Sequence, residues 1–378
     1  MNRSTIFRAG LSILSPVIIG LCLSAVPAVA AENDVVEGNK PSIPIPETKF
    51  SYNWYLAYVN GQEDGADINE FQVRRGYINI ASKFNDWIST RITPDVTVER
   101  EGDGQGDLKM RLKYAYAKFS MPSRGIFTKP AIEFGLVHTP WLDFEQKVDR
   151  YRSQGTMFLQ RAGLFNSADR GITFMSLLGG EIGREYQRNV NSKYPGRYGS
   201  LAVGIYNGGG YHALENNKNK VFRSRLTLRP LPDVLTGLQC SWLLTLGKGN
   251  TAASPDFLVN SGMVSLEDRW FVLTAQYYRG KGNGKGKAVL PDGSAAPQQG
   301  YSLFGEYHFP FTDWGMIGRY DYFDFNREMA DQTSERFIAG LVYYLPGNSK
   351  VFIDLDTVEY QDTGDRDTVG KFTVEVNF

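Results

Sequence analysis

From Phe50 onward, short segments of alternating apolar and polar residues are the feature that most constrains the fold of this chain. The clearest segment, near the end of the sequence, alternates polar residues with four apolar ones: Phe372, Val374, Val376 and Phe378. Alternation with a period of two places apolar side chains on one face of a β-strand and polar ones on the other. Segments of about ten residues are longer than most strands of soluble sheets and long enough to cross a bilayer at a tilt. The pattern therefore predicts a membrane-spanning barrel, apolar outside and polar inside.

Sixteen such segments follow one another, separated by turn residues. Short connectors alternate with longer ones, as in outer-membrane barrels, where tight turns lie at one end and longer loops at the other. Two connectors, 121–129 and 180–197, are too long to be tight turns. The predicted fold is all-β, a transmembrane antiparallel β-barrel of about 16 strands over residues 50–378. The strands are expected near 50–60, 69–81, 87–98, 107–119, 130–138, 169–179, 198–206, 220–229, 235–246, 257–265, 269–279, 300–309, 315–325, 335–345, 350–360 and 368–378.

Composition excludes other classes of protein. After the N-terminal region, no apolar run approaches the roughly 18 residues of a spanning helix, and two cysteines cannot make a disulfide scaffold. The 41 basic and 41 acidic residues cancel, so we expect no nucleic-acid partner. Three scattered histidines and the absence of a Ser/His/Asp pattern lead us to expect no metal site, no cofactor and no enzymatic activity.

The N-terminal region indicates export. Residues 1–30 combine a basic start, an apolar stretch and small residues at the end, which is typical of a signal peptide. Residues 31–49 are polar and contain prolines, so we predict a flexible lead-in to the barrel. Aromatic residues recur near the ends of the predicted strands, as in the girdles at the two membrane interfaces. The expected location is the cell outer membrane of a Gram-negative bacterium.

Four motifs resemble those of the phosphate-selective porin O and P family, in the same order and spacing, over about residues 50–378. They are Phe71–Tyr77 (FQVRRGY), Ile132–Trp141 (IEFGLVHTPW), Asp169–Ile172 (DRGI) and Gly204–Gly210 (GIYNGGG). The resemblance implies a homotrimeric diffusion channel of sixteen strands with an inward-folded third loop. The chain departs from the family pattern at His138 and in the 180–197 segment, and it has no marked lysine excess.

The terminal Phe378 is similar to the residue that the barrel-assembly machinery reads in such proteins. The resemblance therefore implies four kinds of partner: that machinery, outer-membrane lipid, lipopolysaccharide and the small solutes that pass.

Inward-facing charges decide what a water-filled barrel transports. Alternation assigns mainly basic residues to the interior in the early strands and mainly acidic ones in the late strands. On opposite walls, the two sets would create a transverse field; alternatively, they only solvate the lumen. The row of three arginines within the set could be an anion ladder or a brace for the wall. The candidate pore-lining residues are Arg74, Arg91, Lys109, Arg111, Lys113, Arg223, Arg225, Arg229, Glu306, Asp321, Asp354 and Asp356.

The stretch 139–168 is too long for a hairpin turn and is predicted to fold inward as a constriction loop; the alternative is a surface loop over the mouth. Three acidic and four basic residues nearly cancel there, which predicts at most a weak preference for anions. These residues are Asp143, Glu145, Lys147, Asp149, Arg150, Arg152 and Arg161.

Together the sequence predicts an outer-membrane porin, a water-filled channel for small polar or anionic solutes, including phosphate or other anions. The alternative is an outer-membrane barrel that acts as an enzyme, or as an adhesin through its loops.

Overall fold

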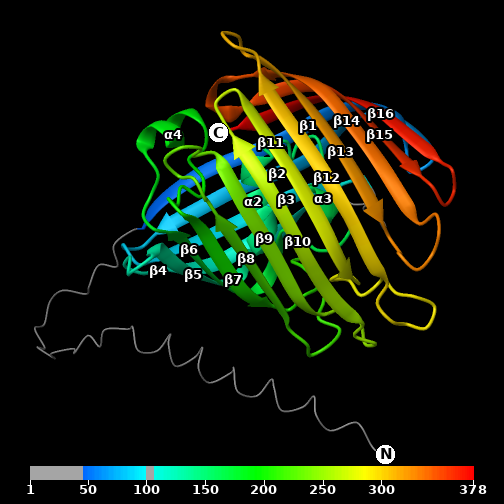
Figure 1. Cartoon of the computed structure of the whole chain (residues 1–378), viewed down its shortest axis with the longest axis horizontal. Helices are drawn as coiled ribbons and strands as arrows, with labels where there is room; N and C mark the ends of the chain where they lie inside the picture. The colour runs from blue at the N-terminus through cyan, green and yellow to red at the C-terminus, as the bar shows by residue number, and fades with distance from the viewer. Residues whose placement is uncertain (1–45, 99–105) are drawn as a thin grey trace, which may run out of the picture. The chain divides into compact units, whose positions relative to one another are not determined.

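The computed structural model describes residues 46–98 and 106–378, whose strands form a closed antiparallel barrel (Figure 1). Each strand pairs with the next one in sequence, and the first pairs with the last, so all sixteen have neighbours on both sides. They are β1 (Glu47–Glu63), β2 (Ala66–Lys83), β3 (Ile88–Val98), β4 (Leu108–Ser120), β5 (Phe127–His138), β6 (Ala168–Leu178), β7 (Gly199–Tyr206), β8 (Val221–Leu228), β9 (Leu238–Lys248), β10 (Asp256–Glu267), β11 (Phe271–Lys281), β12 (Pro297–His308), β13 (Trp314–Asp324), β14 (Thr333–Tyr344), β15 (Lys350–Tyr360) and β16 (Arg366–Asn377).

The predicted fold class, including the number of strands, is confirmed. The main difference is in the first hairpin, where a longer connector was expected over 61–68. There β1 and β2 continue to a two-residue turn at Asp64 and Gly65, both with positive φ (53° and 74°). An Asp-Gly pair adopts this left-handed turn easily, and its twist matches that of the strands. Of the predicted lead-in, residues 47–49 already belong to β1; residues 31–45 and the predicted signal peptide lie outside the described residues.

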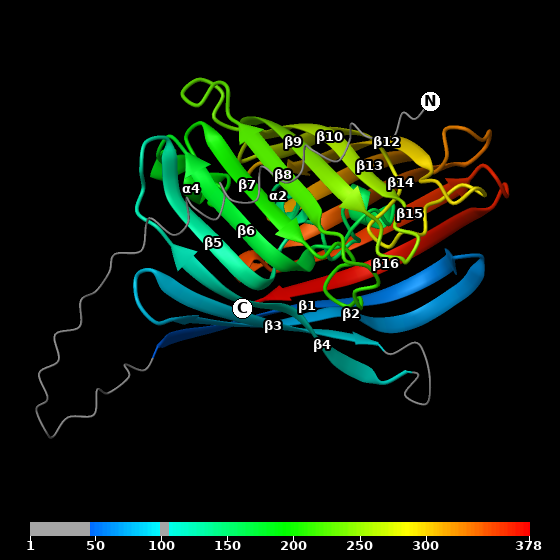
Figure 2. The same ribbon diagram turned by 90° about the horizontal axis from the view of Figure 1, so that it is seen from below.

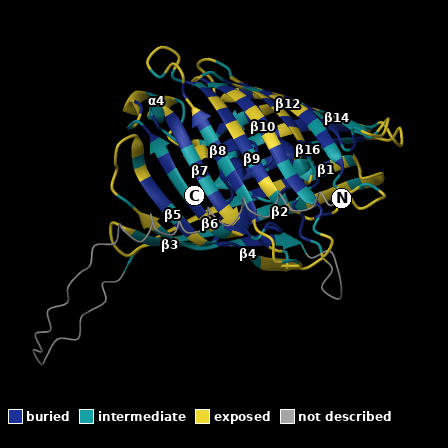
Figure 3. Ribbon diagram, turned by 60° about the horizontal axis from the view of Figure 1, so that its bottom comes forward, coloured by how far each residue is buried: buried dark blue, intermediate teal, exposed yellow. Residues whose placement is uncertain are grey.

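Side chains alternate between the two faces of the barrel wall, as Figure 3 shows by the bands of buried and exposed residues. In β15, Ile353 and Leu355 are 63% and 54% exposed, whereas Asp354 and Asp356 are 2% and 8% exposed. The outer face therefore presents apolar side chains and the inner face polar ones, which is the arrangement of a barrel surrounded by lipid.

The helices of the described residues are short: α2 (Pro140–Val148), α3 (Phe158–Arg161), α4 (Arg184–Asn189) and the 3₁₀ turn η1 (Pro346–Asn348). In this part of the chain, none combines the length and the apolar character needed to cross a membrane. The barrel has two ends. The end at which the even-numbered strands finish is called the turn end, and the opposite end is called the loop end.

The third connection at the loop end, residues 139–167, contains α2 and α3 and folds into the barrel (Figure 2); we call it loop 3. The predicted inward-folded third loop is thus confirmed. Pro140 suits the first turn of α2, where its missing N–H has no partner to lose. Apolar residues of loop 3 pack against inward-facing apolar residues of β8–β15 in one buried cluster. Burying each large apolar side chain contributes about 1.5–3 kcal/mol, so this cluster fixes the loop against one side of the wall.

Candidate functional site

Two cavities lie in the part of the lumen that loop 3 leaves unfilled, one toward each end of the barrel. The loop-end cavity has a volume of about 200 Å³ and the turn-end cavity about 460 Å³. Both are lined by Tyr55 of β1 and Arg152 of loop 3. These two side chains therefore lie where the two cavities adjoin.

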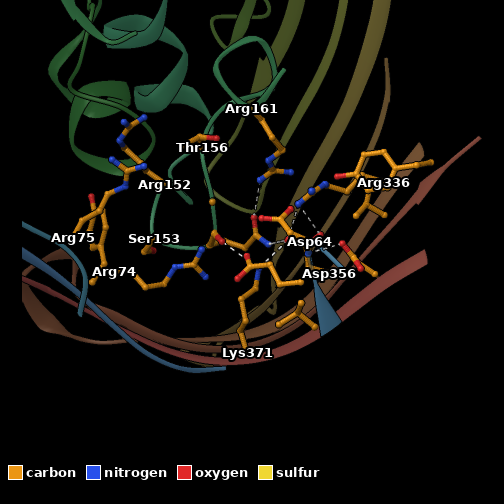
Figure 4. Close-up of a pocket in the computed structure, with 18 residues that line it drawn as sticks. Asp64, Arg74, Arg75, Arg152, Ser153, Thr156, Arg161, Arg336, Asp356 and Lys371 are labelled. Carbon is orange, nitrogen blue, oxygen red and sulfur yellow. Dashed lines mark hydrogen bonds and ion pairs between the residues drawn. The ribbon is translucent and has the colours of Figure 1, made fainter. Parts of the chain in front are cut away.

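Basic side chains predominate in the combined lining: thirteen are basic and six acidic. Figure 4 shows the loop-end cavity, with arginines from loop 3, β2 and β14 pointing into it. The basic residues are Arg74, Arg75, Arg91, Lys113, Lys147, Arg150, Arg152, Arg161, Arg188, Lys193, Arg336, Lys350 and Lys371; the acidic ones are Glu63, Asp64, Asp143, Asp356, Asp367 and Glu375.

A β-bulge adds a cation to the lining. Tyr55 pairs with Arg75 and Leu56 with Val73, so Arg74 is the extra residue of β2 and has no partner on β1. A bulge shifts the alternation by one residue, and both Arg74 and Arg75 line the loop-end cavity. Strict alternation selected only Arg74. For Arg75, the only hint in the sequence was that it directly follows another arginine.

The tip of loop 3 is held against β15 and β16. Gln154 Nε2 donates hydrogen bonds to Asp354 (3.0 Å) and Asp356 (3.1 Å). Lys371 Nζ lies 2.8 Å from Asp356 and 3.3 Å from Asp354. Asp354 and Asp356 are therefore largely neutralised by close partners, and the predicted acidic wall is weaker than the sequence suggested.

The charged residues of loop 3 separate into two groups. Five line the cavities, namely Asp143, Lys147, Arg150, Arg152 and Arg161. Glu145 and Asp149 are instead buried on the side that faces the wall, where Asp149 lies 3.5 Å from Arg319.

The row of three arginines, two on β8 and one directly after it, faces inward, as alternation predicted, but loop 3 and the β6–β7 connector (residues 179–198) cover it. Arg225 Nε donates to the carbonyl oxygen of Pro140 (3.1 Å), and its guanidinium lies over the Phe144 ring. Arg223 lies 4.0 Å from Asp169, and Arg229 donates to the Gly196 carbonyl oxygen (3.3 Å). All three arginines are buried and absent from the lining of both cavities. This placement corresponds to the brace rather than the ladder.

The other candidates on the early strands lie as follows. Arg91 and Lys113 line the turn-end cavity, with Lys113 Nζ 4.0 Å from the centre of the Tyr77 ring. Arg111 is ion-paired with Asp95 (2.8 Å), and Lys109 is exposed near the loop end of β4. Neither Arg111 nor Lys109 lines the two cavities.

Two acidic candidates on the late strands lie under loop 3. Glu306 accepts a hydrogen bond from the Tyr151 hydroxyl (2.7 Å), and Asp321 lies 2.8 Å from Arg319 and 3.3 Å from Arg161. Both carboxylates face inward but are buried and away from both cavities. Both carboxylates therefore help to hold loop 3 against the wall.

Two carboxyl groups of α2 have opposite environments. Burial raises the pKa of Glu145 to about 8, although Arg319 lowers it, and Oε2 has no hydrogen-bond partner among the described residues. Burial also acts to raise the pKa of Asp143, but His138, Lys147 and a hydrogen bond from Tyr194 outweigh it and lower the value. Asp143 therefore stays charged in the cavity, whereas Glu145 favours its neutral form under the loop.

Several lining residues were not among the sequence candidates. Arg336 is inward by simple alternation with Phe337 and could have been found. Arg188 and Lys193 lie in the long β6–β7 connector, whose path the sequence does not specify.

No protein-family model matches the chain, and no curated protein matches it. Among solved structures, it is similar to an anion-selective porin from Comamonas acidovorans (TM-score 0.58, 12% identity, 88% of this chain and 100% of that chain). It is also similar to the outer-membrane protein OmpT of Vibrio cholerae (0.57, 10%, 91% and 100%) and to OmpF of Salmonella typhi (0.57, 12%, 88% and 98%). These likenesses show the porin fold, and the resemblance to the O and P family is confirmed only to that extent.

Proposed function

We propose that this chain is an outer-membrane porin that passes small anionic solutes through a narrow, cation-lined channel. The excess of basic side chains, thirteen against six, carries the proposal. Fixed positive charge along a confined aqueous path raises the local concentration of anions and repels cations. The preference is expected to be stronger than the charges of loop 3 alone predicted, because β2–β4 and the β6–β7 connector contribute further cations.

The constriction explains why the solutes should be small. Arg152 is 7% exposed and Tyr55 8% exposed, so both side chains are closely surrounded where the two cavities adjoin, and we take this place as the narrowest part of the path. The Arg152 guanidinium is also held by Gln160, to which it donates a hydrogen bond of 2.9 Å. A fixed cation at the narrowest point offers a partner to each passing anion.

Reconstitution of the purified protein in planar bilayers tests the proposal. We expect stepwise channel openings and, in a potassium chloride gradient, a reversal potential of the sign set by chloride. Openings with a reversal potential of the sign set by potassium would overturn the anion preference. A barrel that never conducts, but binds cells or hydrolyses lipid, would instead support the adhesin or enzyme alternative.

The finer parts of the proposal are phosphate as a solute and a homotrimer in the outer membrane. Competition of phosphate with chloride current tests the first. Cross-linking in mild detergent, together with fractionation of cell membranes, tests the second. The Vibrio cholerae OmpT structure includes a form described as a trimer, which makes this assembly a reasonable expectation.

A further inference from the structure

The β6–β7 connector enters the barrel at the turn end, where a tight turn would leave the mouth open. Asn191 Nδ2 donates hydrogen bonds to the Lys147 carbonyl oxygen (2.9 Å) and to Glu267 of β10 (2.7 Å). Arg150 of loop 3 donates to the Val190 carbonyl oxygen (3.4 Å). The connector is thus attached both to loop 3 and to the wall.

Tyr194 adds three further contacts to this attachment. Its ring packs against Phe144 of α2 with 5.3 Å between centroids, and the Arg225 guanidinium lies 4.9 Å from its centre. Its hydroxyl donates a hydrogen bond to Asp143. Loop 3, the connector and the β8 arginine therefore form one packed unit.

Two lysines of this unit, one from loop 3 and one from the β6–β7 connector, face cavities without an ion-pair partner among the described residues. Lys147 and Lys193 both line the turn-end cavity and also a neighbouring cavity of about 270 Å³ beside β4–β7. Within the described residues, neither ammonium group forms an ion pair, whereas Arg150, Arg161 and Lys371 in the same lumen all do. A cation with no carboxylate within ion-pairing distance, in a confined space, favours a mobile counterion beside it.

The acidic group that shares both cavities with these two lysines has other partners. Asp143 lines both cavities, but it accepts the Tyr194 hydrogen bond and lies 3.8 Å from His138. Burial lowers the pKa of Lys147, Asp143 raises it, and Lys193 and Arg91 lower it further, as expected where cations outnumber anions. Arg91 and Arg188 line the same turn-end cavity and add to the positive potential.

We propose that Lys147 and Lys193 form a residence site for small divalent anions at the turn end of the channel, separate from the constriction at Tyr55 and Arg152. The site deepens the proposed function, on which it rests: an anion that has passed the constriction meets a second group of cations. Two ammonium groups from separate segments suit a divalent anion, because each can pair with one of its charges.

Sulfate and methanesulfonate are matched probes, similar in shape but carrying two charges and one. We expect sulfate at the turn end to reduce the chloride current through the protein, and methanesulfonate to reduce it much less. In Lys193→Gln and in Lys147→Gln, the sulfate effect should fall several-fold. The control is Arg184→Gln, which removes a cation from the same connector but from a residue that lines neither cavity.

A second readout does not require conduction. Sulfate should raise the thermal unfolding temperature of the detergent-solubilised protein, and the rise should be lost in Lys193→Gln but kept in Arg184→Gln. Equal sulfate responses in all these proteins, by current and by unfolding, would overturn the site while leaving the porin proposal intact. Absence of any chloride current would remove the proposed function, but a sulfate shift that depends on Lys193 would still support the site.

Discussion

The inner faces of two parts of the wall follow the same alternation but have different surroundings. On β8–β13, inward-facing residues such as Phe257 and Phe304 pack under loop 3, and charged ones such as Arg225 and Asp321 form buried contacts there. On β1–β4 and β16, inward-facing residues line the two cavities. We call these the covered wall and the open wall. Alternation therefore identifies the residues that face inward, whereas loop 3 decides which of them meet water.

The largest effect is expected from removing the apolar anchor of loop 3 on the covered wall. Trp141 is 1% exposed, and Trp141→Ala should lower the free energy of unfolding by about 3–5 kcal/mol through lost packing and a cavity. The temperature at which the folded gel band disappears measures the change. Trp87→Ala is the control, since Trp87 is 56% exposed and should matter far less. Equal shifts for the two variants would mean that loop 3 is not anchored by this cluster.

The second prediction contrasts one arginine from each environment. Arg152→Gln removes the cation at the constriction and should raise conductance while reducing the chloride-to-potassium permeability ratio several-fold. Arg225→Gln leaves buried partners unsatisfied and should lower stability by about 1–3 kcal/mol with little change in the ratio. Bilayer recordings and thermal unfolding of both proteins test this; a ratio that follows Arg225 and not Arg152 would reverse our assignment of the two walls.

The third prediction concerns pH and Glu145 on the covered side of loop 3. The folded state holds this carboxyl at a pKa of about 8, above its ordinary value, so it binds a proton more tightly than the unfolded chain does. Its stabilising contribution is therefore fully present below the unfolded pKa and is lost as the pH rises toward and through 8. Glu145→Gln should flatten the fall in unfolding temperature between about pH 5 and 8.5. An unchanged pH profile in the variant would show that Glu145 does not titrate in this range.

The smallest effects are expected at the bulge on the open wall. Arg74→Gln and Arg75→Gln should each reduce the chloride preference modestly, because both guanidiniums line a cavity that retains other cations. Arg269→Gln, in the β10–β11 turn and outside both cavity linings, should leave the preference unchanged. If only one of the two substitutions changes the chloride preference, only one of these arginines faces the channel, as strict alternation requires, and the bulge is not present in the working protein.

Most of the fold follows from residues that act locally. Apolar and polar residues alternate in β16, from Lys371 to Asn377, and this sets one face toward the outside regardless of what happens elsewhere. The pattern was therefore sufficient for the number, order and type of the strands. In the first hairpin only the length of the connector was predicted wrongly, because an Asp-Gly turn needs just two residues and the two strands extend up to it.

The site was less predictable because it depends on contacts between distant residues. The path of loop 3 across the lumen results from packing of residues such as Phe144 and Phe158 against strands far away in sequence. The β6–β7 connector takes its position from Tyr194 and Asn191, whose partners belong to loop 3 and β10. The bulge at Arg74 shifts the alternation by one residue, and a period of two cannot reveal such a shift.

The pairing of β1 with β16 has a consequence for how the molecule is assembled. Asn53 pairs with Asn377, which lies 324 positions further along the sequence. Bringing such distant strands together carries a large loop-closure entropy and slows folding, so the seam should be among the last parts to form. Until it forms, the edges of both strands are free to pair with other chains. The barrel should therefore close late and in a single step at the β1–β16 seam. A helper protein that keeps other chains away from these two strand edges would speed that slowest step.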